Sequence, residues 1–85
     1  MINFDKFEFK ISKHFRNNWM RKWDWDLYDL KQSLKESYAI EKVGNYKYEA
    51  YTKYKTKGKS RKLVFVIYKL DQTLYIITGT EGGKI

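Results

Sequence analysis

Residues 46–55 read YKYEAYTKYK, and this stretch decides the fold class because its side chains alternate with a period of two. Such alternation is typical of a β-strand whose two faces meet different surroundings. One face is uncharged and suits a core, whereas the other is mainly basic and suits solvent. The uncharged face holds Tyr46, Tyr48, Ala50, Thr52 and Tyr54, and the opposite face holds Lys47, Glu49, Tyr51, Lys53 and Lys55.

Three further strands are predicted around this one. A short strand over residues 39–43 ends at Gly44-Asn45, and the loop 56–60 leads into LVFVIY at residues 63–68. The second of these is apolar on both faces, as a central or doubly covered strand requires. A tight connection at residues 70–73 then precedes a last strand over 74–79. The second half of the chain therefore predicts a meander of about four strands.

The first half predicts a strand followed by two helices. Phe7, Phe9 and Ile11 alternate with charged residues, which indicates a strand near residues 5–11. A helix over about 13–22 then carries Phe15 and Trp19 on the side that would face the core. A second helix is predicted over about 27–37.

Two acids compete to cap the second helix. Either Asp24 or Asp26 could accept a hydrogen bond from its first turn. If the cap is Asp26, Trp25 precedes it and can pack on Leu30, while Asp29 places favourable charge in the first turn. The tryptophans of this region are interpreted as core and helix-junction residues rather than as a ligand cage.

Together these elements predict an α+β fold: an N-terminal strand, two helices and a four-stranded, mainly antiparallel meander, with the helices on one sheet face. The 85 residues suit one domain over 1–85, and the 42% hydrophobic content is enough for a core. The longest apolar run, residues 63–68, is far too short to span a bilayer. The N-terminal residues have no apolar segment typical of a signal peptide. We therefore expect a cytoplasmic protein without membrane contact.

Charge points to an anionic partner, because the formal net charge is +8. The excess lies in the second half, where residues 43–85 hold nine bases and three acids. Cysteine is absent and there is one histidine, which argues against disulfides and against cysteine or histidine metal sites. The sequence also lacks the motifs of serine hydrolases, zinc hydrolases and dinucleotide enzymes. We expect neither a metal nor a cofactor.

The basic strand and the loop after it are the strongest candidate for a binding surface. Cations at two-residue spacing can follow a phosphate backbone, and neighbouring tyrosines can stack on unpaired bases. RNA or single-stranded nucleic acid fits better than duplex DNA, since no recognition helix is evident. The alternative is that these lysines only keep a sheet edge soluble. The cations are Lys47, Lys53, Lys55, Lys57, Lys59, Arg61 and Lys62.

Catalysis on RNA would need a proton acceptor, a proton donor and cations at the phosphate. The candidates are His14, Glu49, Tyr51 and Arg61, with Lys47 as a further cation, if the fold brings them together. The alternative for His14 is an ordinary surface or packing residue. The glycine-rich run from Thr78 to Gly83 could offer backbone N–H groups to a phosphate or could be a simple chain end.

Three segments also resemble a known family. These segments are FEFKISKHFRNNWMRKWDWDLYDLKQSL, GNYKYEAYTKYKTKGKSRKLVFVIY and LYIITGTEGG. They resemble small domains of unknown function that are grouped with RelE-type toxins in the barnase, EndoU, colicin and RelE ribonuclease assemblage. The resemblance spans about residues 6–81 and implies a RelE-like fold. In it, His14 matches a histidine of the first helix and Thr78 a threonine of the last strand.

The resemblance implies a metal-independent endoribonuclease that acts on RNA, including mRNA or ribosome-bound RNA. RelE-type toxins use scattered Lys, Arg, Tyr and Glu residues of the sheet, which is the character of Lys47, Glu49, Tyr51, Arg61 and Lys62. They also pair with an antitoxin, so an acidic protein partner is expected. Two alternatives on the same fold stay open: a non-catalytic nucleic-acid-binding module and a protein-interaction module.

Overall fold

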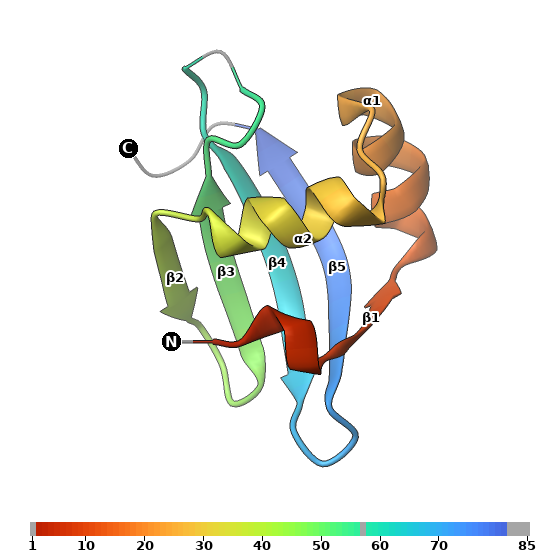
Figure 1. Ribbon diagram of the computed structural model, residues 1–85, viewed down its shortest axis with the longest axis vertical. Coiled ribbons are helices and arrows are strands. Elements are labelled where there is room, and N and C mark those ends of the chain that lie inside the picture. Colours follow the sequence, from red (N-terminus) through yellow and green to blue (C-terminus); the bar gives the residue numbers. More distant parts are fainter. Residues whose placement is uncertain (1, 57, 82–85) are drawn as a thin grey trace.

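Five strands form one mixed sheet, and the helical segments lie over one of its faces (Figure 1). The computed structural model describes residues 2–56 and 58–81. The strand order is β1-β5-β4-β3-β2, so β4 is central. The strands are β1 (Glu8–Ile11), β2 (Ala39–Lys42), β3 (Lys47–Thr52), β4 (Arg61–Tyr68) and β5 (Thr73–Glu81).

The predicted α+β class is confirmed, and the finer arrangement differs from the prediction in three places. Strand β1 lies parallel to β5, so the sheet is mixed rather than a pure meander. The 3-10 helix η1 (Phe4–Lys6) occupies the start of the strand predicted from residue 5. The strand predicted over residues 46–55 ends at Thr52, and a turn follows at residues 54–55.

The first helical segment is not a regular α-helix. Its middle part, η2 (Phe15–Met20), is a π-helix, and α1 (Arg21–Trp23) follows it directly. The hydrogen bonds of a π-helix join residue i to residue i+5, so its turn is wider than that of an α-helix. Residues four positions apart therefore lie close to the same face of the helix. The ring of Trp23 accordingly packs on both Phe15 and Trp19, with centroids 6.0 and 5.2 Å apart.

Asp26, not Asp24, caps the second helix, α2 (Leu27–Lys35). Its side chain accepts a hydrogen bond from the Asp29 backbone N–H, and the Asp29 side chain accepts one from the Asp26 backbone N–H, which completes a capping box. Asp24 instead adopts a left-handed conformation (φ 56°) that ends α1. Trp25 and Leu30 are both buried in the core, as the Asp26 alternative requires.

The core lies between the helices and one face of the sheet. Within β3, Ala50 and Thr52 are 0% exposed on the side toward the helices, as predicted for the core face. The burial does not alternate as predicted, because Tyr51 of the other face is also buried, and Tyr46 of the predicted core face lies before β3 and is 61% exposed. Leu63, Phe65 and Ile67 of the central strand β4 face the same core. The opposite sheet face, which no described helix covers, is called the open face below (Figure 1). It carries Glu49 and Tyr51.

Candidate nucleic-acid interface

Three polar side chains meet on the open face and are called the Tyr51 cluster: Glu49, Tyr51 and Lys62. Tyr51 Oη donates a hydrogen bond to Glu49 Oε1 at 3.1 Å, and Lys62 Nζ lies 3.6 Å from Glu49 Oε2. Tyr51 and Lys62 are opposite each other in the β3–β4 pairing. Burial, and then the hydrogen bond to Glu49, raise the pKa of the Tyr51 phenol above its ordinary value. The cluster therefore combines a carboxylate, a cation and a protonated phenol.

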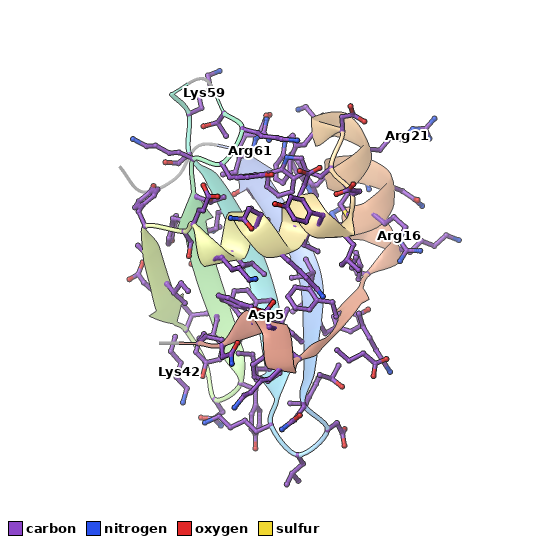
Figure 2. All side chains as sticks on the ribbon, viewed as in Figure 1. Asp5, Arg16, Arg21, Lys42, Lys59 and Arg61 are labelled. Atoms are coloured by element: carbon purple, nitrogen blue, oxygen red, sulfur yellow. The ribbon has the colours of Figure 1, made fainter. Side chains whose placement is uncertain are left out.

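Arg61 lies on the other side of the sheet, against the helical layer (Figure 2). Its guanidinium Cζ is 4.5 Å from the ring centroid of Trp23 and 5.5 Å from that of Trp25. Within the described chain, the buried Nη1 atom has no hydrogen-bond partner. Burial lowers the pKa of Arg61, and the charge of Glu81 opposes this shift. Stacking on indole rings holds the guanidinium in place without occupying its N–H donors.

A cavity of about 340 Å³ opens beside this guanidinium and is called the Arg61 cavity. Lys59 and Ser60 come from the loop before β4, and Glu81 from the end of β5. Lys59 stands near the tip of its loop in Figure 2. The lining thus combines three cations with two hydroxyl groups and one carboxylate. Its residues are Lys55, Thr56, Lys59, Ser60, Arg61 and Glu81.

Glu81 is held by two groups of the first helical segment. Lys22 Nζ forms an ion pair with Glu81 Oε1 at 2.9 Å, and Trp23 Nε1 donates to Glu81 Oε2 at 3.3 Å. The hydrogen bond from Lys22 is the main cause that lowers the pKa of Glu81. Lys22 also lines a second cavity, of about 310 Å³, together with His14. The Lys22–Glu81 pair therefore connects the two cavities.

The predicted catalytic residues do not form one group. Glu49 and Tyr51 meet on the open face, whereas Arg61 points toward the helices on the opposite face. His14 belongs to the helical layer, where its Nδ1 lies 3.1 Å from Asn18 Nδ2. The separation follows from strand alternation, since Arg61 and Lys62 are neighbours in β4 and must point to opposite faces.

The predicted binding lysines also divide between the two faces. Lys47 and Lys62 lie on the open face, and Lys53 Nζ lies 5.8 Å from the ring centroid of Tyr38. Lys55 instead pairs with Asp29 of α2 at 2.9 Å, because its backbone turns into the left-handed region at φ 52°. Lys57 lies outside the described residues.

The open face is less basic than the sequence indicated, because it also carries acids from neighbouring strands. Glu41 of β2 lies directly opposite Glu49 of β3, and Glu8 is on β1. Thr78 occupies the same row of the sheet, opposite Val64. These acids lower the net positive charge of the open face.

Glu81 was not among the site residues predicted from the sequence. The signal available was that residues 43–85 contain only three acids and that this one ends the last strand. Its partners Lys22 and Trp23 are almost 60 residues away in the chain. That pairing depends on the packing of the first helical segment over β5.

The fold and the cavities define this chain as a two-layer α+β protein with a basic end. No family model matches the chain, and neither the curated proteins nor the solved structures give a significant match. In the described part of the chain, no helix is long and apolar enough to cross a membrane. The same residues contain no group of three or more side chains suited to hold a metal ion.

Proposed function

We propose that this protein binds single-stranded RNA, with a backbone phosphate in the Arg61 cavity. The observation that carries the proposal is the guanidinium of Arg61, stacked on two indoles with its buried Nη1 unpartnered among the described residues. A guanidinium binds phosphate through its N–H donors, and Arg61 lines this cavity. Lys59 adds a second cation at the same cavity.

RNA is preferred among anionic ligands because the chain combines a net charge of +8 with exposed aromatic rings. Lysines neutralise the backbone, whereas aromatic rings stack on unpaired bases. Single strands also adapt to a surface whose cations lie at one end and around one edge. The resemblance to RelE-type toxins supports the same ligand.

A second candidate function, metal-independent endoribonuclease, is favoured by the Tyr51 cluster. Glu49 would accept the proton of a ribose 2′-hydroxyl as its oxygen forms a bond to phosphorus. The bond from phosphorus to the 5′-oxygen breaks, and Tyr51 donates a proton to that leaving oxygen. Lys62 would stabilise the charge on the phosphate. The products are a cyclic phosphate and a 5′-hydroxyl.

The test of both functions is incubation of purified protein with end-labelled single-stranded RNA in EDTA, with binding and strand breaks measured in parallel. We expect Lys59→Gln to weaken binding several-fold, and Arg61→Lys to weaken it about tenfold because lysine lacks the planar fork. Lys6→Gln is the matched control, since it removes one exposed charge on η1, outside both cavities. Lys59 is exposed, so its variant also tests the site without disturbing the core.

For cleavage, Glu49→Gln should reduce strand breaks by about 100-fold and Tyr51→Phe by a similar factor, while binding persists. Binding without breaks, on free RNA and on ribosome-bound mRNA, would overturn the endoribonuclease and leave the binding function standing. Equal RNA binding by wild type, Lys59→Gln and Arg61→Lys would overturn the Arg61 cavity as the site. Absence of any binding would overturn both functions and direct the search to an acidic protein partner.

A further inference from the structure

Two hairpins enclose a third cavity, of about 420 Å³, at the far end of β4 from Arg61. One hairpin joins β2 to β3, and the other joins β4 to β5. The volume lies within the range of about 300–1,000 Å³ typical of small-ligand sites. We call it the tyrosine cavity, after Tyr46, Tyr48 and Tyr68, which line it.

The aromatic lining is partly fixed and partly accessible. The ring of Tyr48 stacks on the buried ring of Phe65, with centroids 5.6 Å apart and an interplanar angle of 14°. Tyr46 and Tyr68 keep 61% and 48% of their surface exposed, and their ring centroids are 6.4 Å apart. Ile67, which is 4% exposed, adds an apolar contact at the same cavity. Such a lining suits a planar, partly apolar ring system.

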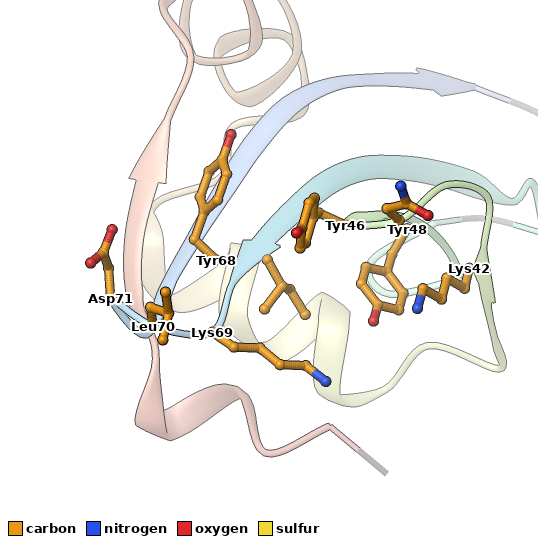
Figure 3. A pocket seen from close by; sticks show the side chains of 9 residues that line it. Lys42, Tyr46, Tyr48, Tyr68, Lys69, Leu70 and Asp71 are labelled. Carbon is orange, nitrogen blue, oxygen red and sulfur yellow. The ribbon is translucent and has the colours of Figure 1, made fainter.

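Two lysines add positive charge to this aromatic lining. Lys42 comes from the β2 end and Lys69 from the turn after β4, and Figure 3 shows both side chains reaching toward the space beside Tyr48. Neither lysine forms an ion pair with an acid of the described chain. Asp71 also belongs to the lining, but its carboxylate points away from these two amines in Figure 3.

We infer that the tyrosine cavity binds a nucleoside monophosphate group, its base against the tyrosine rings and its phosphate between Lys42 and Lys69. A planar base matches the accessible ring faces, and stacking on tyrosine tolerates any base. A phosphate matches two lysines that approach from separate hairpins. The same group occurs as a free nucleotide and as a unit of an RNA strand, and the experiment separates these sources.

The site is independent of the Arg61 cavity. Lys42 lies at one end of the molecule in Figure 2, and Lys59 and Arg61 lie at the other. The eight residues of β4 separate the two ends, which corresponds to about 25 Å at the usual rise per residue. A variant at one end can therefore lose ligand binding there without affecting ligand binding at the other end.

The experiment is calorimetric titration of the full chain with adenosine 5′-monophosphate, adenosine and inorganic phosphate, and then with a short 5′-phosphorylated oligoadenylate. We expect the monophosphate to bind at least about tenfold more tightly than adenosine or phosphate alone. Tyr46→Leu and Lys69→Gln should each weaken this binding about fivefold or more.

Two variants serve as matched controls. Tyr28→Leu removes another highly exposed tyrosine, on α2, and Lys6→Gln removes an exposed lysine of η1 that lines neither the tyrosine cavity nor the Arg61 cavity. Both should leave monophosphate binding within about twofold. Lys59→Gln should weaken RNA binding at the Arg61 cavity alone. A failure of the Arg61 cavity as the RNA site can therefore be distinguished from a failure of the tyrosine cavity as the nucleotide site.

If the oligonucleotide binds and Tyr46→Leu weakens it while the free monophosphate does not bind, the source is an RNA strand and the site stands. If the free monophosphate binds with the expected losses, the source includes free nucleotide. Monophosphate and oligonucleotide binding that Tyr46→Leu and Lys69→Gln leave unchanged would overturn the inference. Absence of binding by both probes would overturn it as well.

Discussion

At the scale of single residues, Asp29 connects helix α2 to the loop after β3. Its Oδ1 accepts a hydrogen bond from Tyr54 Oη at 2.8 Å and forms an ion pair with Lys55 Nζ at 2.9 Å. The hydrogen bond from Lys55, followed by that from Tyr54, lowers the pKa of Asp29 from 3.8 to about 2. One carboxylate thus completes the capping box of α2 and holds the loop after β3.

This lowered pKa predicts a pH-dependent contribution to stability. A carboxylate whose pKa falls on folding stabilises the protein above its unfolded pKa, and the effect disappears as pH falls through the folded pKa. The difference in unfolding temperature between wild type and Asp29→Asn should therefore be constant above about pH 5 and shrink between pH 3.8 and about 2. Circular dichroism melts across this range measure it.

Asp71→Asn is the control for Asp29→Asn, because it removes the same charge from an exposed turn residue that pairs with no described cation. It should show little of this pH dependence. A difference for Asp29→Asn that stays the same from pH 7 to pH 2 would contradict the role given to the ion pair and its hydrogen bonds.

At the scale of elements, the first helical segment lies so close to β5 that only glycine fits beneath it. A Cβ added at Gly79 would lie 2.9 Å from Phe15 Cε1 and 3.1 Å from Trp23 Cη2. Phe15 is 0% exposed and belongs to the core. The backbone oxygen of Lys62 would also lie 3.1 Å from this added Cβ. This contact sets the position of the aromatic residues that support Arg61.

Gly79→Ala should therefore destabilise the protein by about 1–3 kcal/mol through overpacking. The measurement is the free energy of unfolding from urea denaturation. Gly44→Ala is the matched control, since a Cβ there meets only Lys47, at 3.4 Å or more. A Gly79→Ala protein as stable as the Gly44→Ala protein would show that the helical segment can shift away from β5.

At the scale of the whole molecule, the distribution of charge predicts how RNA binding responds to salt. The cations near the Arg61 end belong to the loop before β4 and to the start of that strand. Neutralising about three phosphates there corresponds to a slope of about −2 in log K against log salt concentration for a single strand. Lys59→Gln should reduce this slope by about one.

Titrations at several salt concentrations measure the slope. Lys6→Gln, the exposed lysine of η1, should leave it nearly unchanged. Binding that does not weaken between low and physiological salt would show that RNA is not held through its phosphates, and would contradict the placement of a phosphate beside Arg61.

Features that depend on neighbouring residues were predictable from the sequence. The period of two over residues 46–55 placed Ala50 and Thr52 in the core, and both are fully buried. The polar residue before the second helix was recognised as a cap, although the choice between Asp24 and Asp26 needed the structure. The apolar run of β4 indicated a central strand, which it is.

Features that depend on distant segments were not predictable. The sequence placed Arg61 with Glu49 and Tyr51 because all three belong to the same basic region. The structure puts Arg61 on the opposite sheet face, where it stacks on tryptophans of the helical layer. The π-helix also escaped prediction, because its pattern of aromatic residues suits an ordinary helix as well.

The α+β class, the core face of β3, the basic second half and the aromatic side of the first helix follow from local patterns in the chain. Alternation, capping and charge are properties of residues close together in sequence. The parallel pairing of β1 with β5, the contact of Glu81 with Lys22 and the tyrosine cavity between two hairpins arise from long-range packing. Those pairings join residues up to 65 positions apart, and packing of the helices on the sheet selects among the pairings that local patterns allow.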